Sequence, residues 1–446
     1  MSSDPLLHVK DTYYFDVPKR LWPVDYESPQ QLADEVGEWT VRNNADYQEW
    51  EADRFIQELR TLVTDQHALD GAKAAWLGWQ HEEPKLRHGR PFDQYVEDAV
   101  ADLQSTAKQW AKGLEEPRSD AAQAYLSEFP DAQLQWMLLL KDGDSASAWQ
   151  AVREKMDSRE VLDEYISSPR GHWSSATLDD YNSHLSGKIF IPQPFATLKN
   201  AYEAQSGFAL SRFMVIEIVV AILLFVAFRW LASKVIHGQA PKGKLWNLLE
   251  SFLMFLKTDV VEKGIDPHDS KKFLPLLWTI FMFILGCNLM GMLPWVGSPT
   301  ASLAVTAGLA LVVFIVGTAV GIKHFGLLGY LKNLCPDLGL PMYLAIPIVP
   351  MVWVIEFLSL FIKHAILAIR LLANMVAGHL VLLGIMGLAF GAHAATMHAG
   401  SWTALSVVVI LGTTILSIME LFVAFLQAYV FTLLASLFIG AASSHH

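Results

Sequence analysis

Five apolar runs occupy the second half of the chain, separated by short polar stretches. Three of them have about the 20 residues that cross the hydrocarbon core of a bilayer, and two are longer. We therefore expect five membrane-embedded helices. The runs are Phe213–Leu231, Phe273–Leu293, Leu303–Ile322, Met342–Phe390 and Trp402–Ala442.

The two long runs raise the question of whether each is one helix or a hairpin. A single helix over Met342–Phe390 would be roughly 70 Å long at about 1.5 Å per residue, more than twice the core thickness. No Gly or Pro interrupts Met351–Ala377, so no turn is encoded there. We predict one long, strongly tilted helix, and the same argument applies to Trp402–Ala442. The shorter segment Lys244–Lys263 is amphipathic and is expected to lie along the membrane interface.

The first half of the chain has a different pattern. Residues 1–30 read as irregular, residues 31–166 show apolar residues at three- and four-residue spacing typical of helices, and residues 167–207 read as an irregular linker. Nine of the fifteen Trp precede the membrane region, which favours a packed helical domain over a disordered tail. The predicted fold is therefore all-α: a soluble helical domain followed by a polytopic membrane domain over residues 208–446.

Charge follows the same division. Residues 1–205 hold 36 acidic and 20 basic side chains, a net of −16, whereas residues 206–446 hold 9 and 13, a net of +4. Lys residues cluster between the first and second runs and after the third. By the positive-inside rule these loops are cytoplasmic, which puts the N-terminal domain outside and the C-terminus inside. The first twenty residues lack the features of a signal peptide or mitochondrial presequence, so a bacterial membrane is the simplest expectation.

One cation inside the fourth run demands an explanation. Arg370 cannot deprotonate, and its placement at the centre of a membrane helix costs at least about 2.5–3.5 kcal/mol. An intramembrane ionisable residue is by default a functional site with a partner. Polar residues at compatible spacing accompany it on this run: Glu356, Ser359, Lys363, Asn374 and, just beyond, His379. For Glu356 or Lys363 taken singly, a buried structural hydrogen bond is an equal alternative.

The fifth run carries a second polar seam. It includes Ser417, Glu420 and Gln427, and the last two are seven residues apart and so share one face. Two long helices with polar seams are most stable when the seams face each other or a wet cavity. A contact between His379 and Glu420 would form a titratable pair suited to relaying protons.

These motifs resemble those of a known family. The run from Arg370 to His379, Arg-Leu-Leu-Ala-Asn-Met-Val-Ala-Gly-His, is similar to the signature of subunit a of F-type ATP synthases. The stretch from Glu420 to Thr432 resembles that family's last helix, and Asn288–Pro294 resembles its third-helix motif. The resemblance covers about residues 211–442.

The resemblance implies a stator without a catalytic site, cofactor or metal of its own, held in the bacterial inner membrane against a ring of c subunits and beside the b subunits of the peripheral stalk. It implies two offset aqueous half-channels separated by Arg370, with Asn374 and Gln427 flanking it and His379 and Glu420 in the outside half-channel. Glu356, Ser359, Lys363 and Ser417 become secondary channel-lining candidates. Many members carry an acid where this chain has His379 and a histidine where it has Glu420, so the pair is exchanged here.

The chain departs from the family pattern at two places, and two other functions can be weighed against the family's. The turn at Pro299–Thr306 lacks the acidic residue that the family often has there, and the N-terminal domain is far longer than the family's usual N-terminus. An independent secondary transporter with an Arg-centred substrate site would show internal repeats and broken half-helices, which the sequence lacks. A mere membrane anchor would leave Arg370 unexplained. The coupling ion, proton or sodium, stays open because its carboxylate would lie on the ring.

Overall fold

A computed structural model describes residues 11–63, 66–82, 87, 89–112, 120–236, 243–293, 296–333, 342–390 and 398–443. The chain divides into two compact units. The N-terminal unit comprises Val17–Phe190 and Pro194–Ala209. The membrane unit comprises the described parts of Met1–Asp16, Ile191–Gln193 and Leu210–His446.

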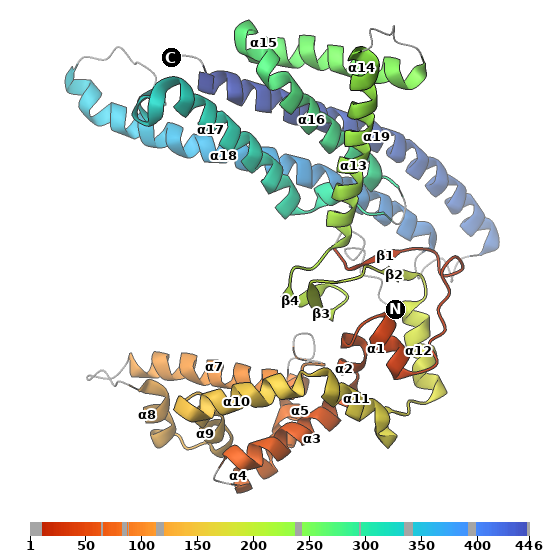
Figure 1. Ribbon diagram of the computed structural model, residues 1–446, viewed down its shortest axis with the longest axis vertical. Coiled ribbons are helices and arrows are strands. Elements are labelled where there is room, and N and C mark those ends of the chain that lie inside the picture. Colours follow the sequence, from red (N-terminus) through yellow and green to blue (C-terminus); the bar gives the residue numbers. More distant parts are fainter. Residues whose placement is uncertain are drawn as a thin grey trace. The chain divides into compact units, whose positions relative to one another are not determined.

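The N-terminal unit is built from short helices followed by a small β-hairpin (Figure 1). Its elements are α1 (Pro29–Glu35), α2 (Trp39–Arg42), α3 (Ala45–Leu62), α4 (Gln66–Asp70), α5 (Ala72–Glu82), α7 (Phe92–Ala111), α8 (Ala121–Glu128), α9 (Ala132–Leu139), α10 (Gly143–Met156), α11 (Arg159–Ser167), the 3₁₀ turn η2 (Pro169–Gly171), α12 (Ser175–Leu185), β2 (Lys188–Phe190), β3 (Ala196–Asn200) and β4 (Glu203–Gly207). Strands β3 and β4 pair antiparallel.

Side-chain caps start several of these helices. The Asn44 side chain accepts a hydrogen bond from the backbone N–H of Asp46 at the start of α3, and Asp131 accepts from Gln133 and Leu134 at the start of α9. Each cap satisfies a donor that the first turn of a helix leaves unpaired. These local signals explain why so charged a segment is broken into many short helices.

The tryptophans of this unit are mainly core residues, as the sequence indicated. Trp76, Trp79, Trp136 and Trp149 are at most 7% exposed and pack in one cluster with α3 and α7. Trp22, at 47% exposed, is an exception. The expectation of a packed helical domain is therefore confirmed.

The boundaries of this domain differ from the sequence expectation. Residues 167–207 are not an irregular linker, since they hold α12 and three strands, and α12 packs its Leu185 against Leu32 of α1. Residues 1–30 are not wholly irregular either, because the strand β1 (Tyr14–Asp16) lies within them. Turn residues such as Pro169 and Gly171 marked breaks between elements, and these breaks were read as the absence of elements.

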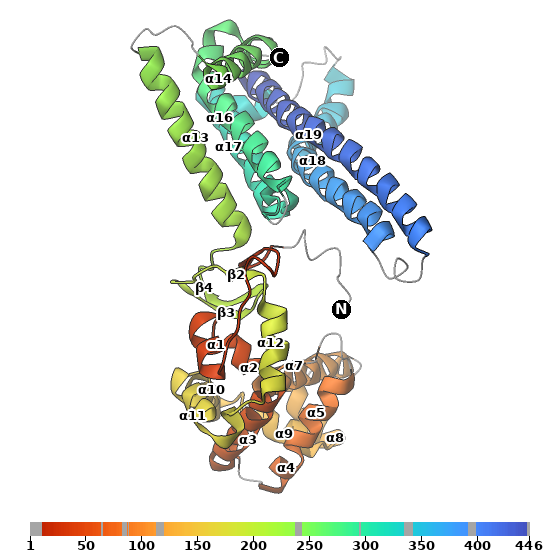
Figure 2. The ribbon, with the colours of Figure 1, turned by 90° about the vertical axis from the view of Figure 1, so that its right-hand side faces the viewer.

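The membrane unit consists of long helices (Figures 1 and 2). Among the residues that the structure describes, five helices are long and apolar enough to cross a membrane, which confirms the predicted number. The elements are α13 (Arg212–Ile236), α14 (Lys244–Phe255), the π-helical segment η3 (Leu256–Val261), α15 (Glu262–Gly264), α16 (Pro267–Gly291), the 3₁₀ turn η4 (Pro299–Ala301), α17 (Leu303–Asn333), α18 (Met342–Phe390) and α19 (Ala399–Ser443).

Both long runs form single helices, as predicted. Figure 2 shows α18 and α19 side by side, and both run obliquely to α13 in Figure 1. The third span extends past the predicted end at Ile322 and bends at Gly326, whose φ of 71° takes it out of the helical region. The amphipathic segment is helical and is not among the candidate spans, and its place at the membrane interface stays a prediction.

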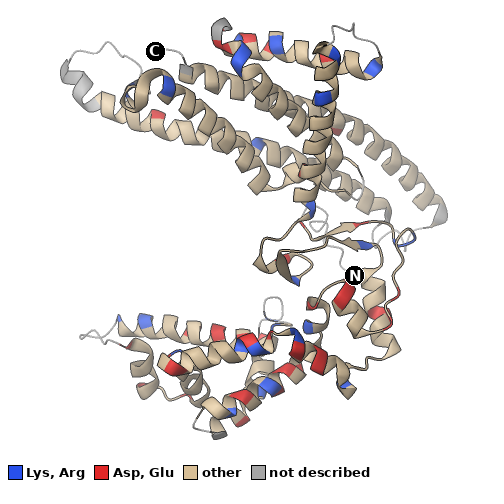
Figure 3. Cartoon of the chain, viewed as in Figure 1, with Lys and Arg blue, Asp and Glu red and all other residues tan. Residues whose placement is uncertain are grey.

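Helix α16 supplies the core of this unit. Leu277, Phe281 and Ile284 are fully buried and pack with Phe431 and Ala435 of α19. By contrast, α13, α18 and α19 expose many large apolar side chains, and charged residues are sparse over the spans in Figure 3. Such apolar exposure suits a surface that meets lipid or other membrane subunits rather than water.

The segment before β1 caps the first span. The backbone N–H of Arg212 donates to the Thr12 carbonyl at 2.8 Å, and that of Phe213 donates to Asp11 Oδ1 at 3.2 Å. An acidic side chain at the start of a helix also complements the helix dipole. Residues 11–16 therefore belong to the membrane unit although they lie almost 200 positions before it.

A buried ionisable cluster lies between α2 and α3 in the N-terminal unit. Arg42 Nη1 donates to the Tyr47 hydroxyl at 3.1 Å, and that hydroxyl donates to Glu51 Oε1 at 3.1 Å. The pKa of Glu51 is raised from its ordinary 4.5 to about 8, mainly by burial and also by the Asp93 carboxylate, while Arg42 and the Tyr47 hydrogen bond act in the opposite direction. Burial likewise raises the pKa of Tyr47.

This cluster predicts a pH-dependent stability. Between pH 4.5 and about 8 the folded unit keeps a proton on Glu51 that the unfolded chain loses, so stability falls as pH rises, by roughly 3–5 kcal/mol in all. Glu51→Gln, which still accepts from Tyr47, removes this slope. Amide hydrogen exchange of α3 in the full-length protein measures it, and Glu128→Gln on the surface of α8 is the control. An unchanged slope in Glu51→Gln would contradict the assignment.

Candidate functional site

The two longest helices form an antiparallel pair that carries most of the predicted site residues. Their contacts run in opposite directions along the two helices: Trp402 Nε1 donates to the Ala389 carbonyl at 3.0 Å, Gly378 meets Glu420, and His364 stacks on Phe438. With 49 and 45 residues, these helices are roughly 73 and 68 Å long at about 1.5 Å per residue. Polar residues on the facing sides of the two helices can therefore meet where the helices overlap.

Arg370 lies on the outside of this pair. Its side chain is exposed, and no carboxylate of the described residues lies within 4.0 Å of it. Its neighbour one turn earlier, Ile366, is 48% exposed, so the face around Arg370 is open. Asn374, one turn later, is half-buried. A fixed charge in a membrane needs compensation, and the described residues supply no carboxylate for Arg370.

His379 and Glu420 are brought together, as the sequence predicted. His379 Nδ1 lies 3.8 Å from Glu420 Oε1, with side chains 23% and 10% exposed. Gly378 permits this approach, because a Cβ there would lie 2.8 Å from Glu420 Oε1. His379 Nε2 and Glu420 Oε1 are buried and have no hydrogen-bond partner among the described residues. A separation of 3.8 Å and two unsatisfied atoms fit a water-mediated contact.

Gln427 faces the interior of the unit. It is 4% exposed, and its Nε2 makes no hydrogen bond to a described residue. It lies two turns after Glu420 on α19, so both project toward the same side of that helix. The predicted seam on α19 is therefore present at these two positions.

The secondary candidates form a separate group toward the start of α18. Lys363 Nζ lies 3.6 Å from Glu356 Oε2, and both side chains are about half exposed. Ser359 is half-buried between them along the helix. Ser417 is exposed and donates to the Thr413 carbonyl of its own helix at 2.9 Å, so it is not drawn into either group. Along α18 and its partner helix, the paired side chains fall into two groups, one on each side of Arg370 in the sequence of α18.

Sequence reasoning missed two buried polar residues near this pair. Asn288 of α16 is fully buried, donates to the Ala424 carbonyl of α19 at 3.1 Å and accepts from the Thr300 hydroxyl at 2.8 Å. It was noted only as part of a motif. His364 is 8% exposed and sits beside Lys363. Its position does not fit the seven-residue spacing of Glu356, Lys363 and Arg370, although a histidine inside an apolar run is itself a visible signal.

The described residues contain no group of three His, Cys, Asp or Glu side chains placed to hold a metal ion. What the arrangement offers is instead a set of isolated protonatable groups around one fixed cation. Such groups can pass protons.

Comparisons with known proteins all indicate the same family. A family model described as ATP synthase A chain matches residues 213–440. The ATP synthase subunit a of Anaeromyxobacter dehalogenans (strain 2CP-1 / ATCC BAA-258) is 43% identical over 206 residues, which are 46% of this chain and 50% of that protein. The ATP synthase subunit a of Chloroherpeton thalassium is 37% identical over 277 residues, 60% of this chain and 77% of that protein. That of Chlorobium phaeobacteroides is 34% identical over 285 residues, with 62% and 78% covered.

Coverage of the relatives is uneven. The chain spans about half the length of the Anaeromyxobacter protein and more than three quarters of the other two. The family model begins at residue 213, one residue into α13, so it leaves the whole N-terminal unit unmatched.

The Asn288 bridge yields a stability prediction. Asn288→Leu keeps the volume but removes two hydrogen bonds, to the Ala424 carbonyl and from the Thr300 hydroxyl, which keeps only Ser298 Oγ at 2.9 Å; the cost is about 1–3 kcal/mol. Thr306→Val is the matched control, because the buried Thr306 hydroxyl reaches only carbonyls of its own turn, at 3.3 Å. Thermal unfolding in detergent should show the larger loss for Asn288→Leu. Equal losses would mean that the bridge between α16 and α19 does not stabilise the unit.

Proposed function

The chain belongs to the ATP synthase subunit a family, and on this basis we propose that it is the proton-translocating stator subunit of an F-type ATP synthase. In this role it forms two aqueous half-channels against a rotating ring of c subunits and couples proton flow to ATP synthesis. The observation that carries the proposal is the place of Arg370: exposed on α18, without a described carboxylate beside it, between two separate polar groups.

The spacing along α18 supports two half-channels. Glu356 precedes Arg370 by 14 residues and His379 follows it by nine, which is roughly 21 and 14 Å along the axis at about 1.5 Å per residue. The two groups are therefore offset toward opposite ends of the helix. Neither reaches the other without passing Arg370.

Arg370 separates the half-channels electrostatically. Its permanent charge repels a proton that would move directly between them, and it attracts the carboxylate of a ring subunit once that carboxylate has lost its proton. A ring carboxylate passing Arg370 must then release its proton on one side and take one up on the other. Net flow thus requires the ring to turn.

His379 and Glu420 suit the half-channel on the other side from Glu356. In a water-linked pair, a proton can move from the imidazole to the carboxylate and on to the ring, and the two groups titrate together rather than independently. Gln427 and Asn374 supply neutral hydrogen-bonding groups between this pair and Arg370.

The remaining features of the proposal concern the complex. We place the chain in a bacterial inner membrane, beside the b subunits of the peripheral stalk, with the N-terminal unit outside and the C-terminus in the cytoplasm. An independent transporter is disfavoured, because family membership assigns the chain to a complex and α18 and α19 are uninterrupted rather than broken at mid-membrane. An anchor role is disfavoured because it gives Arg370 no purpose.

Arg370→Ala tests the proposal directly. Without the fixed charge, the ring carboxylate loses its attractor and protons can bypass the ring, so proton-driven ATP synthesis should be abolished while the complex still assembles. The readout is ATP synthesis by membrane vesicles energised with an imposed proton gradient. Arg229→Ala, an exposed arginine near the end of α13, is the control and should retain synthesis. Synthesis by the Arg370→Ala complex would overturn the mechanism.

Exchanging the titratable pair tests their contact. His379→Glu combined with Glu420→His keeps one carboxylate and one imidazole across the same 3.8 Å gap, so it should preserve more ATP synthesis than either single change. The same vesicle assay gives all three rates. If the fold-loss of the double variant equals the product of the two single fold-losses, the two side chains act separately.

A further inference from the structure

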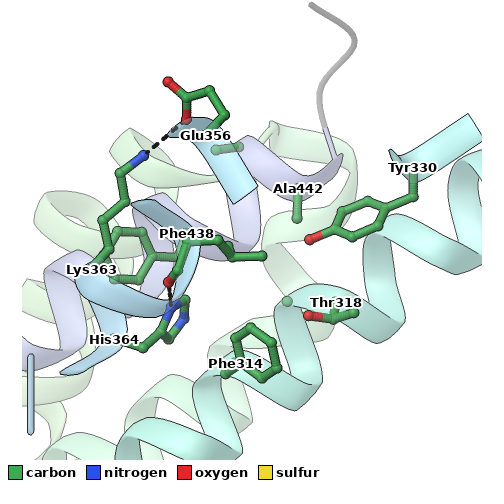
Figure 4. A pocket seen from close by; sticks show the side chains of 11 residues that line it. Phe314, Thr318, Tyr330, Glu356, Lys363, His364, Phe438 and Ala442 are labelled. Carbon is green, nitrogen blue, oxygen red and sulfur yellow. Dashed lines mark hydrogen bonds and ion pairs between the residues drawn. The ribbon is translucent and has the colours of Figure 1, made fainter. Parts of the chain in front are cut away.

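A cavity lined by both polar and apolar residues lies between α17, α18 and α19, beside the Glu356–Lys363 ion pair (Figure 4). Its volume is about 170 Å³, against the 10–15 Å³ or so that one water molecule needs, so it has room for several waters. Helix α18 contributes Glu356, Lys363 and His364, and α17 contributes Thr318 and Tyr330.

His364 is fixed in the wall of this cavity. Its Nδ1 donates to the Leu360 carbonyl at 2.8 Å, since a carbonyl can only accept. Its ring is held between Phe314, with ring centres 5.2 Å apart, and Phe438, at 4.8 Å. The hydrogen bond to the Leu360 carbonyl keeps a proton on Nδ1, so in the neutral form Nε2 carries the free lone pair.

Two buried polar atoms in this wall lack a hydrogen-bond partner among the described residues. They are His364 Nε2, in a side chain that is 92% buried, and Thr318 Oγ1. The two come from different helices and line the same cavity. Because an unsatisfied buried polar group is costly, water within the cavity is the simplest partner for both.

The charged surroundings of His364 come mainly from its own helix. Lys363 is the preceding residue, and its positive charge disfavours protonation of the His364 ring. The Glu356 carboxylate lies 3.6 Å from Lys363 Nζ and favours protonation of the ring. Helix α17 offers the phenol of Tyr330, and α19 lines the cavity only with Phe438, Ala441 and Ala442. His364 is thus the one imidazole that the described cavity wall contains.

We infer that this cavity is a water-filled part of the proton path and that His364 Nε2 carries protons across it, between the ring face at Arg370 and the medium at the Glu356 end. His364 precedes Arg370 by six residues, roughly 9 Å along the helix at about 1.5 Å per residue. In each transfer, Nε2 takes a proton from water on the ring side and releases it to water on the far side, while Nδ1–H stays on the Leu360 carbonyl. The inference rests on the proposed function and assigns a further proton-carrying residue to it.

His364→Gln is the first test, because glutamine keeps a polar side chain but cannot carry a proton at neutral pH. In vesicles containing the complete complex, ATP synthesis driven by an imposed proton gradient should fall at least about tenfold. A positioned acid–base group typically contributes about a hundredfold or more, so this is a conservative expectation. His324→Gln is the matched control, since His324 is a half-exposed histidine of α17 outside the cavity. Unchanged synthesis in His364→Gln across pH 6–9 would overturn the inference.

Chemical rescue separates proton transfer from a structural role. His364→Ala leaves a space of imidazole size in the cavity wall, so imidazole added to the vesicles should restore synthesis in this variant and leave His364→Phe unaffected. A loss that imidazole does not restore would show that the ring only fills space. If both variants fail to assemble, Thr318→Cys tests the water instead: reaction of this thiol with a small membrane-permeant silver ion supports the cavity, and no reaction overturns it.

These outcomes are distinct from failure of the proposed function. If the unaltered complex makes no ATP from a proton gradient, or Arg370→Ala still does, the stator role itself is wrong. If both behave as proposed and only the His364 variants match the control, the role stands and the assignment of His364 falls.

Discussion

A fixed positive charge in an apolar helix is the constraint on which the rest of the membrane unit depends. Arg370 cannot be neutralised by losing its proton, and α18 presents it on an exposed face where no described carboxylate approaches. In the proposed function, the compensation comes from a carboxylate of a ring subunit. A cation whose counter-charge is a carboxylate on another subunit can control proton transfer there, because its charge is balanced only when that carboxylate is ionised.

In the proposed function, the helices around Arg370 use this local charge to separate two proton paths. Because α18 and α19 are single antiparallel helices far longer than the membrane core is thick, they carry polar groups at well-separated heights on one continuous scaffold. His379 with Glu420 lies on one side of Arg370, and Glu356, Lys363 and the cavity at His364 lie on the other. Helix α16 holds the arrangement together through its apolar core and through Asn288.

Much of this arrangement could be predicted from the sequence, because it depends on local patterns along the chain. The apolar runs gave five spans, the absence of breakers gave two unbroken helices, and the arginine motif together with Glu420 and Gln427 pointed to the contact with His379. What escaped prediction depends on tertiary contact. The cavity at His364 needs three helices to form, and the Asn288 bridge joins residues 136 positions apart. In residues 167–207, frequent turn residues concealed α12 and three strands, and α12 is held by the contact of Leu185 with Leu32, far away in the sequence.

The central claim is that the face around Arg370 meets a ring of c subunits rather than lipid. A photoreactive amino acid placed at Ile366, one turn from Arg370 and 48% exposed, measures this in the intact complex. The same probe at Ile222 of α13, which is 56% exposed, serves as the reference for an apolar surface away from the site. The account predicts a covalent product with the ring subunit from position 366 and none from position 222. Products with lipid alone from position 366 would contradict it.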